Sequence, residues 1–286
     1  MSFVAIDWGS SRFRAYRVEP GGVTDRITSA RGIRSASATP AGLAATLLEE
    51  LAPCGLRDAG YQRLPIDLDA IASPAAAVEV ETALATRVTL RPGLALLDGD
   101  ACDVLRGEEV QLLGAHHLRP AGLYAFPGTH CKWIPVERAS GRAVVRTFST
   151  MMTGELHAWL VEDSLVCRGI PEAPAWSDDA FARGVARAAG AGDVIEEVFR
   201  TRARWLLGNL APEAAPSFLS GLLIGHELVT MTERFAAGSA DPIAIVGAER
   251  LAALYAAAAR QLGVATSIVA DEAAIIEGFG RMHDGA

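Results

Sequence analysis

The 286-residue chain lacks an excess of positive charge, has few cysteines and contains no long apolar run. Its net charge of −8 argues against a nucleic-acid binder, which needs a basic surface. The four cysteines form no C-x-x-C pair or metal-ligand spacing, which indicates free thiols in a reducing compartment. No apolar run approaches the ~20 residues that span a bilayer, and Asp7 interrupts the apolar start that a signal peptide would need. These absences predict a cytoplasmic protein with no nucleic-acid partner and no membrane partner.

Several common catalytic motifs are absent as well. The chain has no G-x-x-x-x-G-K-[S/T] phosphate loop, no G-x-G-x-x-G after its first strand and no G-x-S-x-G nucleophile turn. The pair His116-His117 has no cysteine or acidic residue at metal-ligand spacing, so we expect it on the surface of a helix. Any phosphate or catalytic site must therefore be of another kind.

The length predicts two domains, and a hydrophobic content of 50% is enough to build their cores. Three strand-like runs open each half of the chain, with the boundary near residue 118. These strands are expected over 3–8, 12–18 and 23–31, and again over 123–126, 131–136 and 144–149. Further strands are expected over 68–73, 243–246 and 267–270. One helix is expected to begin at about residue 40, and others are expected over 75–85, 104–118, 153–163, 179–189, 192–208, 216–236, 249–262 and 271–282.

The first stretch that suggests chemistry is Asp7-Trp8-Gly9-Ser10-Ser11, between two strand-like runs. Its small residues let a bulky anion approach the backbone, whose N–H groups can donate to it. A carboxylate at the end of the first strand cannot bind phosphate itself, but it can hold a metal ion that bridges to phosphate. The pattern indicates a phosphate-binding hairpin with a Mg²⁺ anchor. The alternative is an ordinary hairpin with a polar turn.

A second strand-turn-strand stretch, Phe126-Pro127-Gly128-Thr129-His130-Cys131-Lys132-Trp133, opens the second half. Two such hairpins could face each other across a cleft and hold phosphates from both sides. Lys132 is the only lysine of the chain and lies just past the turn. A lone lysine is, however, usually a solvated charge.

Two adjacent carboxylates, Glu108 and Glu109, follow Arg106-Gly107 just before the second hairpin. At a helix start such residues often only complement the helix dipole. Alternatively, one of them could take the proton of a substrate hydroxyl.

Two further stretches admit a structural and a functional interpretation. Gly247-Ala248 ends a buried strand before a helix, a place that can carry an adenine or ribose, although many α/β proteins contain it. The stretch from Thr150 to Leu156 is a capped helix start, or part of a substrate site.

Together these stretches resemble the superfamily of sugar kinases, actin and heat-shock chaperone ATPases, and more closely the 2-dehydro-3-deoxygalactonokinase family. The likeness covers most of the chain in order, and Pro-Gly-Thr-His-Cys-Lys-Trp is too specific to arise by chance. The matching segments are Ala5–Ser10, Phe13–Ala15, Arg106–Glu109, Gln111–Ala115, Pro127–Trp133, Met152–Leu156 and Phe218–Gly225.

The resemblance implies an α/β fold with two ribonuclease-H-like (actin-like ATPase) domains, residues 1–118 and 119–286, and ATP in the cleft between them. It implies ATP-dependent phosphorylation of the terminal 6-hydroxyl of 2-dehydro-3-deoxy-D-galactonate in galactonate catabolism. Mg²⁺ is the expected metal. A homodimer and the stereochemistry of the acceptor are left open.

The resemblance also implies roles for individual residues. Asp7 would anchor Mg²⁺, and Glu108 would be the base, with Glu109 as the alternative. A bidentate donor should bind the sugar acid's carboxylate, and the substrate-site candidates are Arg12, Arg14, Arg34 and Glu155. The expected nucleotide-binding residues are Gly9, Ser10, Ser11, Gly128, Thr129, His130, Lys132, Gly247 and Ala248.

One segment departs from the family, which carries Cys-Gly-Met-Val/Ile-Gly-Ser running on to Gly-Trp after its first helix. Here Cys54-Gly55-Leu56 is followed by Arg57-Asp58-Ala59-Gly60-Tyr61, a shortened and altered stretch. If this stretch touches substrate, the acceptor could be another sugar acid, or the activity could be weak. A non-catalytic nucleotide-binding regulator of the same fold is the alternative from another class, although a regulator would need neither Glu108 nor Glu109.

Overall fold

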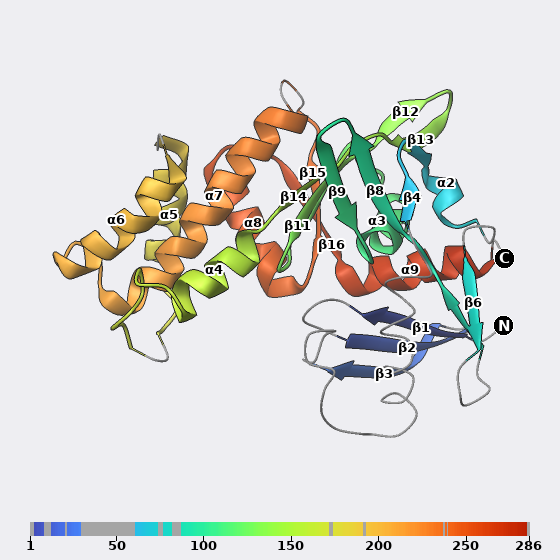
Figure 1. Cartoon of the computed structure of the whole chain (residues 1–286), viewed down its shortest axis with the longest axis horizontal. Helices are drawn as coiled ribbons and strands as arrows, with labels where there is room; N and C mark the ends of the chain where they lie inside the picture. Colours follow the sequence, from blue (N-terminus) through green and yellow to red (C-terminus); the bar gives the residue numbers. More distant parts are fainter. Residues whose placement is uncertain are drawn as a thin grey trace. The chain divides into compact units, whose positions relative to one another are not determined.

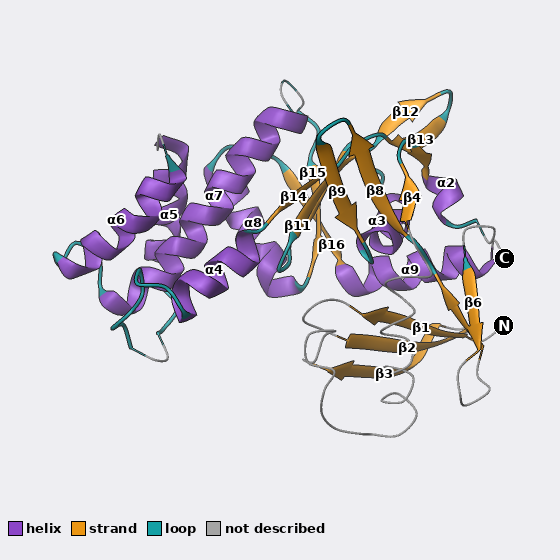
Figure 2. Ribbon diagram, in the orientation of Figure 1, coloured by secondary structure: helices purple, strands orange, loops and turns teal. Residues whose placement is uncertain are grey.

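The structure, a computed structural model, describes residues 3–8, 13–20, 22–29, 61–73, 77–81, 87–171, 174–190, 193–236, 238 and 240–284. The chain divides into two compact units, each assembled from separate stretches of sequence (Figure 1). The first comprises Met1–Pro120, Ile134–Ser149 and Ala270–Ala286, and the second comprises Ala121–Trp133 and Thr150–Val269. Both contain strands and helices, which confirms the predicted α/β class (Figure 2). The boundary between residues 118 and 119 stays a prediction.

A three-stranded antiparallel sheet opens the first unit. It comprises β1 (Phe3–Trp8), β2 (Phe13–Glu19) and β3 (Gly22–Ser29), in that order. The register of β1 and β2 pairs Asp7 with Arg14. Ala5 and Tyr16 are buried together with Ile275 of α9 (Asp271–Asp284). The last helix of the chain therefore packs on the first sheet.

Smaller groups of strands complete the first unit. β8 (Gly93–Asp98) lies between β4 (Tyr61–Arg63), to which it is parallel, and β9 (Ala101–Leu105), to which it is antiparallel. β13 (Arg142–Val145) lies between β12 (Glu137–Ala139) and β5 (Ile66–Asp67). β6 (Val78–Glu81) pairs with β7 (Arg87–Leu90). β13 thus brings residues beyond position 140 back to the first unit.

Two helices of the first unit cross at backbone contact distance. α3 (Glu108–Leu118) meets α9 at Gly114 and Gly278. A β-carbon on Gly114 would lie 1.9 Å from the carbonyl oxygen of Ala274, and one on Gly278 would lie 2.1 Å from that of Val110. Because no larger residue fits at these distances, the two glycines set how closely α3 approaches α9.

Four local predictions in the first unit are wrong. The strand expected over 144–149 is interrupted, since β13 ends at Val145 and the next strand begins at Ser149. Residues 68–71 form helix α2 (Leu68–Ile71) rather than a strand, because the Asp67 side chain accepts a hydrogen bond from the Asp69 N–H (3.0 Å) and caps the helix. Residues 78–81 form strand β6 rather than a helix, and their alternating Val-Glu-Val-Glu sequence has the two-residue period of a strand. α3 begins at Glu108 rather than residue 104, because residues 101–105 pair with β8 and Gly107, with a φ of 101°, separates strand from helix.

A five-stranded sheet forms the centre of the second unit, in the order β14-β11-β10-β15-β16. These strands are β10 (Leu123–Phe126), β11 (Cys131–Pro135), β14 (Ser149–Met151), β15 (Ile243–Gly247) and β16 (Thr266–Ala270). β10 and β15 are parallel neighbours, and every residue of both is buried. Parallel neighbours end at the same edge of a sheet, so the turn after β10 lies beside the turn after β15.

The helices of the second unit lie within a few residues of their predicted ranges. They are α4 (Thr153–Glu162), α5 (Asp178–Gly190), α6 (Val194–Leu206), α7 (Ala215–Phe235) and α8 (Glu249–Gln261), with the 3₁₀ helix η3 (Pro212–Ala214) before α7. α5 and α7 lie side by side (Figure 1), and a β-carbon on Gly221 would lie 2.0 Å from the Phe181 carbonyl oxygen. Among the described residues, no helix combines the length and apolar character that crossing a bilayer requires.

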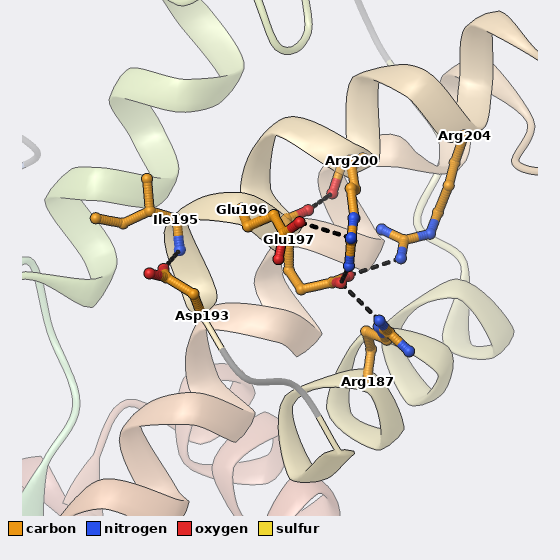
Figure 3. Close-up of polar contacts among 8 residues, drawn as sticks. Arg187, Asp193, Ile195, Glu196, Glu197, Arg200 and Arg204 are labelled. Carbon is orange, nitrogen blue, oxygen red and sulfur yellow. Dashed lines mark hydrogen bonds and ion pairs between the residues drawn. The ribbon is translucent and has the colours of Figure 1, made fainter.

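A buried carboxylate connects α5 and α6 (Figure 3). Glu197, only 1% exposed, accepts hydrogen bonds from Arg187 (2.7 Å), Arg200 (2.7 Å) and Arg204 (2.6 Å). Arg187 above all, with the other two arginines, holds the pKa of Glu197 well below its usual range. A buried charge is tolerated here because it is fully paired and hydrogen-bonded.

Candidate active site

Arg14 joins two carboxylates in the first unit. Its Nη2 lies 2.7 Å from Asp7 Oδ2, and its Nη1 lies 2.5 Å from Asp271 Oδ2. Burial raises the pKa of Asp7, while Arg14 lowers it and Asp271 raises it further. Arg14, predicted as a donor to the substrate, thus holds the end of β1 to the start of α9. Asp271 was not predicted, and its only sequence signal is an acidic residue at a helix start.

The turn before α3 lies against Asp7. A β-carbon on Gly107 would lie 3.5 Å from Asp7 Oδ1, the oxygen opposite the one that Arg14 contacts. Gly107, which directly precedes the two candidate bases Glu108 and Glu109, therefore lies beside the predicted metal anchor. The described residues contain no group of three metal-binding side chains. Mg²⁺ commonly uses one or two carboxylates with waters and substrate phosphates, a requirement that Asp7 Oδ1 suits.

The two candidate bases have different surroundings. Glu109 is 2% exposed, and its Oε2 accepts a hydrogen bond from the Gly107 N–H (2.7 Å). Burial, with a smaller contribution from Glu108, raises the pKa of Glu109 to about 8. Glu108 is only partly buried, and its Oε2 accepts a hydrogen bond from the Arg106 N–H (3.1 Å). Burial therefore favours the protonated form of Glu109, while Glu108 is the more accessible of the two carboxyls.

In the second unit, the turns that follow β10 and β15 are adjacent. A β-carbon on Gly247 would lie 3.6 Å from Pro127 Cδ and 3.8 Å from the Pro127 carbonyl oxygen. Ala248 comes next and directly precedes α8. A β-carbon on Gly128 would meet nothing nearer than the His130 carbonyl oxygen, at 3.9 Å. Among the described residues the side of Gly128 that a β-carbon would occupy is thus open, so a ligand can approach from that side.

The start of α4 packs against the same turn. A β-carbon on Gly154 would lie 2.2 Å from the Gly128 carbonyl oxygen, and the Glu155 N–H donates to the Thr129 carbonyl oxygen (2.9 Å). The His130 Nε2 lies 2.5 Å from Glu155 Oε2. Four predicted site residues, Gly128, Thr129, His130 and Glu155, are therefore brought together at the N-terminal end of a helix, where anions bind well.

Lys132 is buried rather than a solvated surface charge. It is 7% exposed, and its Nζ donates to Thr150 Oγ1 (2.8 Å). The neighbouring Cys131 Sγ lies 3.5 Å from the Gly128 nitrogen, and burial raises the pKa of this thiol to about 12. Cys131 therefore supports the turn as a neutral thiol and does not act as a nucleophile.

One buried group beneath this turn was missed from the sequence. Glu227 of α7 contacts Trp133 of β11 and Thr153 of α4. Its helical spacing from Ile224 and Met231, both buried, is the signal that could have placed a carboxylate on the inner face of α7.

The structure thus gathers the predicted residues into two sets, one in each unit. The first unit brings together Asp7 and Arg14, and Gly107, which precedes Glu108 and Glu109, lies beside Asp7. The second brings together Gly128, Thr129, His130, Lys132, Glu155, Gly247 and Ala248. The predictions for Gly9, Ser10, Ser11, Arg12 and Arg34, and the altered residues 54–60, lie outside the described residues.

Comparisons with known proteins agree with one another. The sequence model of the 2-keto-3-deoxy-galactonokinase family matches residues 7–282. The chain is 33% identical to the 2-dehydro-3-deoxygalactonokinase of Escherichia coli (strain K12), over 97% of this chain and 96% of that protein. It is 34% identical to a protein of Rhizobium meliloti (strain 1021) that provisionally carries the same name, over 95% of this chain and 93% of that protein. A crystal structure from Sinorhizobium meliloti, also provisionally so named, matches with a TM-score of 0.82 at 32% identity, over 98% of this chain and 97% of that chain.

Proposed function

The chain belongs to the 2-keto-3-deoxy-galactonokinase family, and from this we propose that it transfers the γ-phosphoryl group of ATP to 2-dehydro-3-deoxy-D-galactonate. The acceptor is the terminal 6-hydroxyl, and the reaction serves galactonate catabolism. The proposal includes a cytoplasmic enzyme with two ribonuclease-H-like domains, residues 1–118 and 119–286. A homodimer stays a prediction.

The observation that supports the catalytic part of the proposal is that Gly107, which directly precedes Glu108, lies beside Asp7, since a β-carbon on it would be 3.5 Å from Asp7 Oδ1. Phosphoryl transfer needs a base, charge neutralisation and positioning. Glu108 takes the proton of the 6-hydroxyl as the bond from that oxygen to the γ-phosphorus forms. The bond between the γ-phosphorus and the β,γ-bridging oxygen breaks, and ADP leaves.

The remaining residues position the reactants. Asp7 would hold Mg²⁺, and the bound ion would neutralise phosphate charge. The backbone of Gly128 and Thr129, with buried Lys132, contacts the phosphates, and Gly247 and Ala248 line the adenosine site. Arg14 is already engaged by Asp7 and Asp271, so its part is to hold the anchor. Arg12 and Arg34 remain the proposed donors to the sugar acid's carboxylate.

A substrate screen tests the proposal directly. Purified chain is incubated with Mg²⁺ and ATP and a panel of sugar acids, and the products are identified by mass and by the position of the phosphate. We expect turnover with 2-dehydro-3-deoxy-D-galactonate and a phosphate on oxygen 6. Turnover with a different acid would change the acceptor. Tight ATP binding without turnover on any acid would instead indicate the non-catalytic regulator.

Paired variants test the base. Glu108→Gln should lower kcat by ~10²–10⁴ and leave ATP binding unchanged, because the loss of a positioned base has about this effect. Glu109→Gln is the matched control and should keep a kcat close to that of the wild type, since a protonated carboxyl and an amide have similar shape. The reverse pattern would move the base to Glu109.

A further inference from the structure

The buried carboxyl of Glu227 has no part in the chemistry described so far. It lies in α7 and is 0% exposed. The Trp133 Nε1–H donates to its Oε1 (2.6 Å), and the Tyr255 hydroxyl donates to its Oε2 (2.8 Å). The Thr153 hydroxyl donates to Oε2 as well. Glu227 therefore connects α7 to β11, α4 and α8 at one point.

Trp133 is next to a residue of the proposed nucleotide site, and Thr153 and Tyr255 are each next to a residue that contacts Gly128 of that site. Trp133 directly follows Lys132 in β11. Thr153 directly precedes Gly154, whose backbone packs on the Gly128 carbonyl oxygen. Tyr255 lies in α8, and its hydroxyl oxygen is 2.9 Å from Cys131 Sγ, which in turn contacts the Gly128 nitrogen.

A buried carboxyl is a poor choice for stability alone. Taking such a group out of water is costly, and apolar side chains of similar volume often serve a core as well or better. What a carboxyl offers here is two oxygens that accept hydrogen bonds from three donors in fixed directions. Burial raises the pKa of Glu227, and the bonds from Thr153, Trp133 and Tyr255 lower it. Thr153 is also the first residue of α4, where the helix dipole favours negative charge.

We propose that Glu227 is a positioning residue for the nucleotide, which holds the turn at residues 127–132 and the start of α4 in the arrangement that receives the phosphates. The inference rests on the proposed function, because it assumes that this turn binds ATP. A preformed site binds its ligand without first ordering the groups that make it. Loss of Glu227 should therefore weaken ATP binding and leave binding of the sugar acid unchanged.

The test compares Glu227→Leu with Glu197→Leu. Both side chains are carboxyls of the second unit that are at most 1% exposed. Glu197, however, is bound by Arg187, Arg200 and Arg204 of α5 and α6, none of which belongs to the turn at residues 127–132. Melting temperatures, the KM for ATP, the KM for the sugar acid and the Kd for ATP from calorimetry are measured for both and for the wild type.

We expect Glu227→Leu to raise the KM and Kd for ATP about tenfold, the worth of one hydrogen bond to a charged group, with the KM for the sugar acid unchanged. Glu197→Leu should lower the melting temperature without changing the KM for ATP. Glu227→Gln, which keeps an acceptor for Trp133, should fall between the wild type and the leucine variant.

Three results would overturn the inference. They are an unchanged Kd for ATP in Glu227→Leu, an equal rise in both KM values, or an equal rise of the KM for ATP in Glu197→Leu. If the leucine variant does not fold, Glu227→Gln and Glu197→Gln are compared in the same way, and an unchanged Kd for ATP in the former overturns it. The calorimetric Kd needs no turnover. If the wild type binds ATP but phosphorylates no sugar acid, the proposed function is contradicted. The Kd values of the variants for ATP can still be compared in that case, and they decide the inference about Glu227.

Discussion

The buried carboxyl of Glu109 makes the stability of the chain depend on pH. Folding changes the pKa of this group from 4.5 to about 8, mainly through burial. Between these two values the folded state keeps a proton that the unfolded state has lost. Stability from this group is therefore fully present below pH 4.5 and is lost as the pH rises toward 8. Glu109→Gln removes the titration and keeps an oxygen that can accept the Gly107 N–H.

The size of the effect follows from the pKa shift. A shift of one pKa unit corresponds to about 1.4 kcal/mol, so the full change amounts to about 5 kcal/mol. Between pH 5 and pH 8 the wild type should lose about 3–4 kcal/mol relative to Glu109→Gln, because part of the change occurs outside this window. The variant should match the wild type closely at pH 5 and exceed it in stability at pH 8.

Chemical denaturation measures this difference. The free energy of unfolding is determined by urea titration at half-unit steps from pH 5 to pH 8 for the wild type, Glu109→Gln and Glu19→Gln. Glu19 is exposed on β2, so its variant should follow the wild type at every pH. Parallel pH profiles for the wild type and Glu109→Gln would refute the reasoning, since they would mean that the carboxyl of Glu109 titrates alike in the folded and unfolded chain.

Two further substitutions test the two sets of site residues. Asp7→Asn should raise the Mg²⁺ concentration for half-maximal activity by roughly tenfold or more, the usual scale for a disturbed metal site, and an unchanged Mg²⁺ dependence would remove Asp7 from that role. Gly154→Ala should raise the KM for ATP, because the added β-carbon would lie 2.2 Å from the Gly128 carbonyl oxygen. The control is Gly190→Ala, which should leave the KM for ATP unchanged because a β-carbon there meets nothing within 4 Å.

The sequence was most informative where a structure depends on neighbouring residues. The helices of the second unit and the strands β10, β11 and β15 lie close to their predicted ranges, because apolar periodicity marks them directly. The wrong predictions in the first unit also concern signals carried by a few neighbouring residues. The cap at Asp67 and the two-residue alternation of Val78 to Glu81 were overlooked, while the start of α3 was hidden by the strand that precedes Gly107.

The candidate site divides in the same way. Gly128, Thr129, His130 and Lys132 could be recognised together because they follow one another in a single turn. The difference in burial between Glu108 and Glu109 could not be recognised, since the two are adjacent carboxylates in the sequence. The pKa of a carboxyl depends on how much water the folded chain leaves around it, which neighbours in sequence do not decide.

The sequence by itself therefore determined the elements, the turns and the family-like motifs of this protein, because each of them is encoded within a few consecutive residues. Only the tertiary structure brought Asp271 to Arg14, 257 positions away, and Glu227 to Trp133, 94 positions away. Such partners are chosen by how α9 packs on the first sheet and α7 on the second. That packing arises from apolar burial and close glycine contacts along whole helices, so no short stretch of sequence carries it.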